Sequence, residues 1–463
     1  MNVLFVSWEM DPFLKRGGLG DVASSLPAAL STLGVEVRVI MPYYKAIKLH
    51  QSRKTKIGNL TLAYDRKKER IEIFTIRHPT SAISVYLLQN STFFDVPKPP
   101  DTFPFFNSVI ISIIKQKILD WRPDIIHCND HHTGLIPLLL KEEKIPMKTL
   151  LTIHNLLYQG SIPLGVFTKM GYPHLSSKVS KWEGSSETSR MLAEGIIHTD
   201  IVTTVSPTYA REITTTEYGM GLDEILRGKE GRLFGILNGI QNHWKNNRYV
   251  KIPTLPDWEE VKRKNKLFLQ RKLKLKVGNA IPLLAFIGRF DPNQKGIEIL
   301  YEMLQGSNRD DYQMIVLGSG NIQWVDRFQW LSTFYPKTIA TRLTFDTILA
   351  HQIYGGADFI LIPSRFEPCG LIQMSAMEFG ALPIAHKTGG LADSIRDGFN
   401  GFLFENYSAK SLENTVSKAI NIWKNHRKSY ETMVQNALQT DFSWEKSAGK
   451  YRELYEKLLS GTF

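Results

Sequence analysis

Cysteine is scarce in this chain, which has only Cys128 and Cys369 among its 463 residues. This excludes a disulfide-stabilised scaffold and a cysteine-rich zinc module, and it favours a cytoplasmic location. Long apolar runs are lacking too, because residues 109–114 fall far short of the ~20 residues that cross a bilayer. Residues 2–7 have the pattern of a strand with no basic segment before it, so neither a secretory signal nor a membrane association is expected.

Charge of one sign is in modest excess. Lys and Arg number 57 and Asp and Glu 45, a net charge of +12, in a chain that is 43% hydrophobic and 22% charged. That composition is globular, and the length predicts two domains. No recognition helix or RNA-stacking motif accompanies the charge, so a nucleic-acid partner is not expected.

The basic residues concentrate in one segment, since eight of the fifteen residues in 262–276 are Lys or Arg. Val261, Phe268 and Leu275 recur there at seven-residue spacing and predict an amphipathic surface helix with a basic outer face. A solvated face is the favoured interpretation, and a strip that binds a polyanion is the alternative.

Strands and helices alternate along the chain, which predicts parallel sheets wrapped by helices. The first helix is expected over residues 21–33, with Asp21 as its N-cap and Pro27 as the site of a kink. Strands are predicted at residues 3–7, 35–41, 125–128, 150–153, 201–205, 283–287, 314–317 and 359–362. The fold class is therefore α/β, with two Rossmann-like doubly wound domains. Their predicted bounds are 1–240 and 258–445, with a connector at 241–257 and a C-terminal helix within 446–463.

A glycine-rich segment, KRGGLGD at residues 15–21, joins the first strand to the first helix. Glycines let the backbone approach a ligand closely, and a helix N-terminus offers free N–H groups to phosphate. Lys15 and Arg16 would reinforce such a site. The spacing matches neither the Rossmann nor the Walker pattern, and a purely structural turn is the alternative.

The run KRGGLGDV at residues 15–22 resembles the signature of bacterial glycogen synthases and plant starch synthases. Further matches follow in family order: DHHTGL at 130–135, TIHN at 152–155, YQG at 158–160, TTVSPTYAREI at 203–213, GILNGI at 235–240, GR at 288–289, QKG at 294–296, PSRFEPCGL at 363–371 and TGGL at 388–391. The resemblance extends from residue 1 to about residue 450.

This resemblance implies a retaining GT-B glucosyltransferase, with two Rossmann-like domains facing a central cleft. The N-terminal domain would take the acceptor and the C-terminal domain the nucleotide sugar. The expected donor is a nucleoside-diphosphate glucose, with ADP-glucose favoured, and the expected acceptor is the non-reducing end of an α-1,4-glucan such as glycogen. No cofactor and no metal ion are implied.

The resemblance also implies roles for individual residues. The catalytic residues would be Glu367, His154, Arg289 and Lys295, with Arg289 and Lys295 stabilising the departing diphosphate through their fixed positive charge. His154 and Glu367 would lie beside the transferred glucose. With the residues that the loop patterns themselves suggest, the predicted substrate-binding residues are Lys15, Gly17, Gly18, Asp130, Asn238, Tyr354, Cys369, Gly370, Leu371, Thr388, Gly389 and Gly390. In the last segment, backbone N–H groups would face the diphosphate.

Each of these residues also has a structural interpretation. Arg289 could be a surface ion-pair partner, Lys295 a solvated loop lysine and His154 a core histidine. Tyr354 could stack on the donor's base or pack in the core. Cys369 is expected to be a packed thiol rather than a nucleophile, because no His or Asp accompanies it at a recognisable spacing.

His131 and His132 are adjacent and are expected to point apart, which argues against a metal site. Several positions depart from the family pattern. Gln241 stands where Asp is usual, Ala193 stands in the place of a lysine, and residues 245–247 replace an Asn-Pro pair. Ser375 occupies the position where many related retaining transferases carry a second Glu, so a carboxylate pair is not expected. A catalytically weak glucan-binding or scaffold protein, and a glucosyltransferase that uses UDP-glucose or a small acceptor, remain alternatives.

Overall fold

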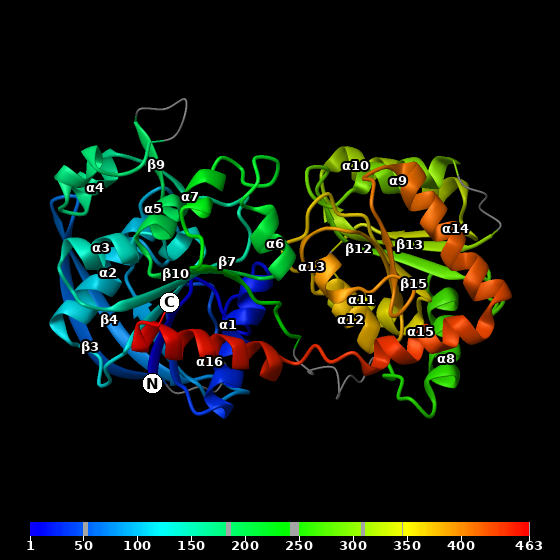
Figure 1. Cartoon of the computed structure of the whole chain (residues 1–463), viewed down its shortest axis with the longest axis horizontal. Helices are drawn as coiled ribbons and strands as arrows, with labels where there is room; N and C mark the ends of the chain where they lie inside the picture. The colour runs from blue at the N-terminus through cyan, green and yellow to red at the C-terminus, as the bar shows by residue number, and fades with distance from the viewer. Residues whose placement is uncertain (50–53, 182–186, 241–249, 307–310, 345, 463) are drawn as a thin grey trace. The chain divides into compact units, whose positions relative to one another are not determined.

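The structure, a computed structural model, describes residues 1–49, 54–181, 187–240, 250–306, 311–344 and 346–462. The chain divides into two units, which are coloured by sequence in Figure 1. Unit 1 comprises Met1–Gly239 with Trp444–Phe463, and unit 2 comprises Ile240–Ser443. The C-terminal helix therefore belongs to unit 1, which its sequence pattern did not indicate. Residues 241–249 of the expected connector, with Gln241 and residues 245–247, lie outside the described residues.

Unit 1 contains a nine-stranded sheet in the order β11-β10-β7-β6-β1-β2-β5-β4-β3. Its strands are β1 (Asn2–Val6), β2 (Glu36–Pro42), β3 (Thr55–Tyr64), β4 (Lys67–Arg77), β5 (Ser84–Gln89), β6 (Ile125–Asn129), β7 (Lys148–Ile153), β10 (Ile201–Thr204) and β11 (Leu233–Gly235). Pairing is parallel from β11 to β5, but β5, β4 and β3 pair antiparallel. The expectation of a parallel sheet was therefore wrong at this edge, where Asp65 and Arg66, both with positive φ, form the two-residue turn of a hairpin.

Helices cover both faces of this sheet. They are α1 (Gly18–Thr32), α2 (Thr102–Gln116), α3 (Ile136–Glu142), α4 (Gly165–Lys169), α5 (Met191–His198), α6 (Pro207–Glu212), α7 (Asp223–Arg227) and α16 (Trp444–Ser460), with 3-10 turns at His131–Thr133 and Pro173–Ser177 and a small ribbon of β8 (Ser161–Pro163) and β9 (Thr188–Arg190). Along β1, Leu4 and Val6 pack with residues of α2, α3 and α5, whereas Val3 and Phe5 pack with residues of α1 and α16. Both faces of β1 are therefore buried, which explains its continuous apolar sequence.

Helix α1 begins earlier than expected. Its first residue is Gly18 and Gly17 is its N-cap, so Asp21 lies in the first turn instead of capping the helix. The helix continues through Pro27. In place of capping, the Asp21 carboxylate accepts a 2.5 Å hydrogen bond from the Lys15 ammonium.

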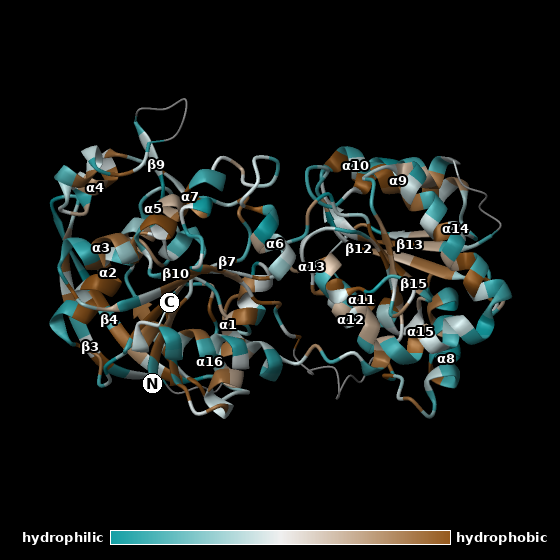
Figure 2. Ribbon diagram, in the orientation of Figure 1, coloured by the Kyte–Doolittle hydropathy of each residue, from teal (hydrophilic) through white to brown (hydrophobic). Residues whose placement is uncertain are grey.

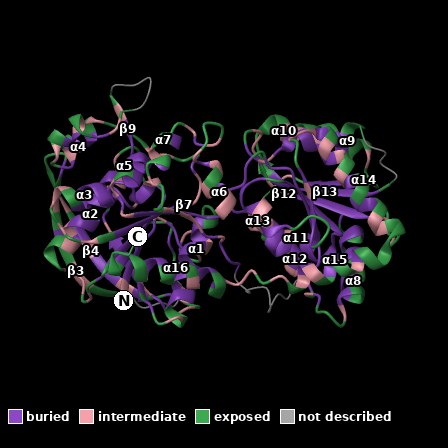
Figure 3. Cartoon of the chain, viewed as in Figure 1, coloured by how far each residue is buried: buried purple, intermediate pink, exposed green. Residues whose placement is uncertain are grey.

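Unit 2 contains a six-stranded, wholly parallel sheet in the order β14-β13-β12-β15-β16-β17. Its strands are β12 (Leu283–Phe290), β13 (Gln313–Gly320), β14 (Ile339–Arg342), β15 (Phe359–Ile362), β16 (Leu382–His386) and β17 (Phe402–Phe404). Its helices are α8 (Trp258–Lys272), α9 (Ile297–Gly306), α10 (Ile322–Phe334), α11 (Thr347–Gly356), α12 (Ile372–Glu378), α13 (Gly389–Ser394), α14 (Ala409–Asn425) and α15 (Arg427–Gln439). The central strands of both units are hydrophobic in Figure 2 and buried in Figure 3. Nowhere in the described ranges is a helix long and apolar enough to span a membrane.

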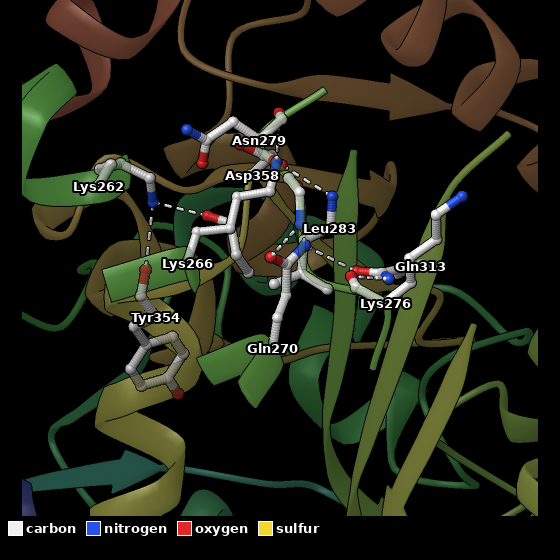
Figure 4. A network of polar contacts seen from close by, with 11 residues as sticks. Lys262, Lys266, Gln270, Lys276, Asn279, Leu283, Gln313, Tyr354 and Asp358 are labelled. Carbon is white, nitrogen blue, oxygen red and sulfur yellow. Dashed lines mark hydrogen bonds and ion pairs between the residues drawn. The ribbon is translucent and has the colours of Figure 1, made fainter. Parts of the chain in front are cut away.

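The basic helix α8 differs from the expected solvated strip. Lys262 and Lys266 are only 5% and 4% exposed, whereas Phe268 is 50% exposed. In Figure 4 the Lys262 ammonium faces the carbonyl of Tyr354, and it donates to the carbonyl oxygens of Tyr354, Ala357 and Phe379 at 3.4, 2.6 and 3.2 Å. The Lys266 ammonium lies 2.5 Å from the Asp358 carboxylate. Part of the predicted outer face is therefore interior, because carbonyl groups and a carboxylate from distant segments provide it with partners.

Candidate functional site

The predicted residues of unit 1 lie just after the carboxyl ends of its parallel strands. Lys15 follows β1, Asp130 follows β6, His154 follows β7 and Asn238 follows β11. Since β7, β6 and β1 are neighbours, their carboxyl ends meet at one edge of the sheet, where α/β proteins bind ligands.

Asp130 and His154 are joined at this edge. The backbone N–H of His154 donates to Asp130 Oδ1 at 2.7 Å, and His154 Nε2 lies 2.9 Å from Asn129 Oδ1. The Asn129 amide nitrogen donates to the carbonyls of Val6 and His127, so its oxygen faces His154, and the proton of the imidazole is assigned to Nε2. Burial lowers the pKa of His154 to about 3, so this side chain is a neutral hydrogen-bonding group at physiological pH.

The Asp130 carboxyl group titrates in an unusual range. Burial raises its pKa to about 7, the negative charge of Glu9 adds to the rise, and the backbone N–H groups of His154 and Asn155 oppose it. Asp130 also has a positive φ of 55°. It can therefore act near neutral pH as a donor or an acceptor toward a sugar hydroxyl.

The glycine-rich segment is organised by Glu9, which sequence reasoning missed. The Glu9 side chain is 1% exposed, and its carboxylate accepts hydrogen bonds from the backbone N–H groups of Arg16, Gly17 and Gly20, the last two at 3.2 and 3.0 Å. Burial raises the pKa of Glu9, while these N–H groups oppose the rise. The N–H groups of Arg16, Gly17 and Gly20 are thus occupied by a protein carboxylate, whereas the sequence pattern had indicated free N–H groups for phosphate at this helix N-terminus. A glutamate between the first strand and a glycine-rich turn was the available signal.

Asn238 offers an unused acceptor. The residue is buried, and its Oδ1 atom has no hydrogen-bond partner among the described residues. Buried polar atoms are nearly always paired in native proteins, so this oxygen is suited to accept a hydrogen bond from a ligand.

In unit 2 the structure brings the predicted catalytic residues together. Lys295 Nζ lies 2.6 Å from Glu367 Oε2, and both side chains are largely buried. The Ser364 hydroxyl donates to the same carboxylate oxygen at 2.9 Å. Exposed Arg289, near the end of β12, donates from Nη2 to Gln294 Oε1 at 3.2 Å. Two cations and a carboxylate therefore occupy the ends of the neighbouring strands β12 and β15.

The loops that carry these groups approach one another closely. The backbone N–H of Arg365 donates to the carbonyl of Gln294 at 2.8 Å. Gly296 has a φ of +64°, and a Cβ atom there would lie 1.8 Å from the Pro363 carbonyl oxygen. Glycine is therefore required beside Lys295 for the two loops to meet.

The remaining predicted residues of unit 2 are placed differently. The N–H of Gly390 donates to the carbonyl of Glu367, and the N–H of Thr388 donates to the carbonyl of His386, both at 3.0 Å. These two N–H groups were expected to face the diphosphate, but both are already bonded within the protein. Tyr354 is buried in the core with its ring centroid 6.1 Å from that of Phe379, which is the packing alternative. The other positions lie in the same loops: Cys369 carries a buried thiol, Gly370 has a φ of +70°, Leu371 is half-buried before α12, and Gly389 begins α13.

His131 and His132 do not point apart. Their ring centroids are 3.7 Å apart, because the two residues lie in a tight 3-10 turn, and burial lowers the pKa of His131 to about 4. Across the described ranges, no cluster of three or more His, Cys, Asp or Glu residues could hold a metal ion. Of the departures from the family pattern, Ala193 is buried in α5 and Ser375 is buried in α12.

The chain has two Rossmann-like units. Cations and a buried carboxylate lie at the strand ends of unit 2, and a neutral histidine lies at the strand ends of unit 1. This combination is that of a glycosyltransferase of the GT-B class. A model of the starch synthase catalytic domain matches residues 2–228, and a model of glycosyl transferases group 1 matches residues 270–440. The chain is 38% identical to the glycogen synthase of Desulfitobacterium hafniense and 36% identical to that of Thermotoga maritima, with 99% of each chain covered. The chain therefore belongs to the glycogen synthase and starch synthase family.

Solved structures agree with this assignment. The catalytic domain of Starch Synthase IV from Arabidopsis thaliana, bound to ADP and acarbose, matches with a TM-score of 0.89 at 29% identity over 99% of both chains. Sucrose-phosphate synthase from Thermosynechococcus elongatus matches with a TM-score of 0.62 at 20% identity over the full length of both chains, and shows the fold alone. These matches confirm the family and the GT-B fold class that the motifs predicted. They also confirm the predicted enzyme class, which is a retaining glycosyltransferase that extends an α-1,4-glucan.

Proposed function

We propose that this protein is a glycogen synthase that transfers glucose from ADP-glucose to the non-reducing end of an α-1,4-glucan with retention of configuration. The observation that carries the proposal is the contact between Lys295 and Glu367, with Arg289 near the end of the neighbouring strand β12. The structure of Starch Synthase IV bound to ADP and acarbose supports the choice of an adenine nucleotide and a glucan-like ligand. A cytoplasmic location fits the scarcity of cysteine.

In this proposal, Arg289 and Lys295 bind the diphosphate of the donor. As the bond to the anomeric carbon breaks, negative charge accumulates on the diphosphate, so fixed cations stabilise the transition state more than the ground state. The Lys295 ammonium has three donors and can keep Glu367 while it binds phosphate oxygens. The Glu367 carboxylate stabilises the positive charge that develops on the sugar ring.

The residues of unit 1 supply the remaining groups. Lys15 adds a half-exposed cation for the donor phosphates. Neutral His154 and the Asn238 amide hydrogen-bond to hydroxyl groups of the glucose, as does Asp130. A neutral imidazole suits this role, because an imidazolium next to the anomeric carbon would oppose the positive charge of the transition state.

The test uses the purified full-length chain with ADP-glucose or UDP-glucose at equal concentration, and with glycogen or maltose as acceptor. Release of nucleoside diphosphate is measured, and the anomeric configuration of the new linkage is read from its proton NMR coupling. The expected result is faster release of ADP than of UDP with glycogen, and an α linkage. A preference for UDP-glucose would refute the donor assignment, and activity with maltose alone would refute the polymeric acceptor. Glycogen binding without release from either donor would identify a non-catalytic glucan-binding protein.

A further inference from the structure

Two buried residues lie behind Glu367, and the motifs assign a role to neither. Ser364 is 1% exposed, and its hydroxyl donates to Glu367 Oε2 at 2.9 Å. The carbonyl oxygen of Ser364 in turn lies 2.9 Å from Nδ1 of His386, the last residue of β16. A chain of contacts thus runs from His386 through Ser364 to the carboxylate.

The second ring nitrogen of His386 has a partner of the same kind. Nε2 lies 3.2 Å from the backbone carbonyl oxygen of Glu405, just beyond β17. Carbonyl oxygens only accept hydrogen bonds, whereas a neutral imidazole carries one N–H. Both contacts are therefore hydrogen bonds only when His386 is protonated, and a neutral ring would lose one of the two tethers.

The surroundings of His386 are mainly aromatic. Its ring centroid lies 5.4 Å from those of Phe404 and Tyr407. The charged groups nearby have other partners: Glu405 pairs with Lys387 at 2.7 Å, Arg365 lies over the Tyr407 ring at 4.5 Å, and Glu298 accepts from the Tyr407 hydroxyl. The described tethers of His386 thus go to the backbone, and they join the loop that carries Glu367 to the end of β17.

The geometry at Glu367 explains why this matters. Ser364 and Lys295 both bind Oε2, so within the described structure Oε1 is the oxygen that accepts no hydrogen bond and is available to a ligand. Without the hydroxyl, the carboxylate could rotate about its terminal torsion, which is broad for glutamate. We propose that Ser364 and His386 are positioning residues that fix the orientation of Glu367. This inference rests on the proposed function, because it assumes that Glu367 acts on the transferred glucose.

The first test compares Ser364→Ala with the wild type, using ADP-glucose and glycogen. Loss of one hydrogen bond to a charged group is expected to lower kcat about tenfold, with the KM for ADP-glucose and the affinity for ADP within about twofold of the wild type. In the Glu367→Gln background the same change should have an effect below about twofold, because the group that Ser364 orients is no longer charged. Equal losses in both backgrounds, or an unchanged kcat, would overturn the inference, as would a loss of ADP binding that accompanies a lower melting temperature.

The second test concerns His386. His386→Gln keeps one donor for only one of the two carbonyls, so it should lower kcat about tenfold and leave the KM for ADP-glucose within about twofold of the wild type. Lys387→Gln is the matched control, because it changes the adjacent exposed residue, and it should keep the wild-type kcat and KM. An unchanged kcat in His386→Gln, or a loss of ADP binding that accompanies a lower melting temperature, would overturn the role of His386.

These outcomes separate the inference from the proposed function. A wild-type enzyme that transfers no glucose from ADP-glucose refutes both. An active wild type in which Ser364→Ala and His386→Gln match it refutes the positioning role alone.

Discussion

Replacing Lys262 by Met tests how unit 2 tolerates a buried lysine. The Lys262 ammonium donates to carbonyls at the carboxyl ends of α11 and α12, those of Tyr354, Ala357 and Phe379. Orphan carbonyls at helix ends are favourable partners for a cation. Burial nevertheless lowers the pKa of Lys262 from 10.5 to about 7, with Asp358 opposing the fall and Lys266 adding to it. The side chain is therefore near its titration midpoint at neutral pH.

The sign and size of the effect follow from linkage. Between pH 7 and pH 10.5 the unfolded chain binds a proton at this lysine that the folded chain does not, so the free energy of unfolding rises with pH across that window. Each pH unit contributes about 1.4 kcal/mol. The full difference of 3.5 units (10.5 − 7) is worth about 5 kcal/mol, an upper limit. Lys262→Met removes this dependence.

The assay is urea unfolding of the full chain from pH 6.5 to 9, followed by circular dichroism. The free energy of unfolding of the wild type minus that of Lys262→Met should increase by about 2 kcal/mol between pH 7.5 and 9. The control is Lys264→Met on the same helix, where Lys264 is exposed, and its difference from the wild type should not change with pH. A difference for Lys262→Met that is equally flat would show that the buried amine stays charged, which would refute the reasoning.

Three further predictions concern the site and its surroundings. Arg289→Ala and Lys295→Ala should each lower kcat by ~10²–10³ with a smaller change in the KM for ADP-glucose; steady-state kinetics check this, and a change in KM alone would make the two residues ground-state anchors. Glu9→Gln should lower the melting temperature and raise the KM for ADP-glucose, because an amide cannot accept from three N–H groups as the carboxylate does; unchanged values would show that the loop is held by other contacts. The double variant Lys264→Gln with Lys274→Gln should keep glycogen affinity and turnover within about twofold, since exposed charges contribute little; a large loss that low salt reverses would instead indicate an anionic partner.

The parallel strands could be predicted from the sequence because both of their faces are buried. A strand covered on both faces, such as β1, has a continuous apolar sequence that needs no knowledge of its neighbours. The hairpin of β3 and β4 was missed because it is half-buried: in β4, Ile71 and Ile73 are buried and alternate with the more exposed Arg70 and Glu72. This period-two pattern was a usable signal.

The interior of α8 was beyond sequence reasoning for a different reason. Lys266 is buried because Asp358, 92 residues further along the chain, pairs with it. A lysine-rich sequence by itself predicts a solvent-exposed face, and only the fold shows that Asp358 lies beside Lys266. The glycine-rich segment shows the same limit. The Glu9 carboxylate contacts the N–H groups of Gly17 and Gly20 only because the intervening loop folds back, and the sequence does not show that path.

The contact between Lys295 and Glu367 has two consequences for the site. A carboxylate as buried as Glu367 needs a compensating charge, and Lys295 supplies it before any donor arrives. In the proposed function, Lys295→Ala therefore removes a cation from the leaving group and also leaves Glu367 without its ion-pair partner, so its kinetic loss combines two effects. Arg289 is exposed and its guanidinium donates to the neutral amide of Gln294, so in the proposed function Arg289→Ala removes charge from the leaving group and leaves the ion pair of Lys295 with Glu367 in place. A larger loss of kcat for Lys295→Ala than for Arg289→Ala is therefore the expected sign that the ion pair with Glu367 matters for turnover.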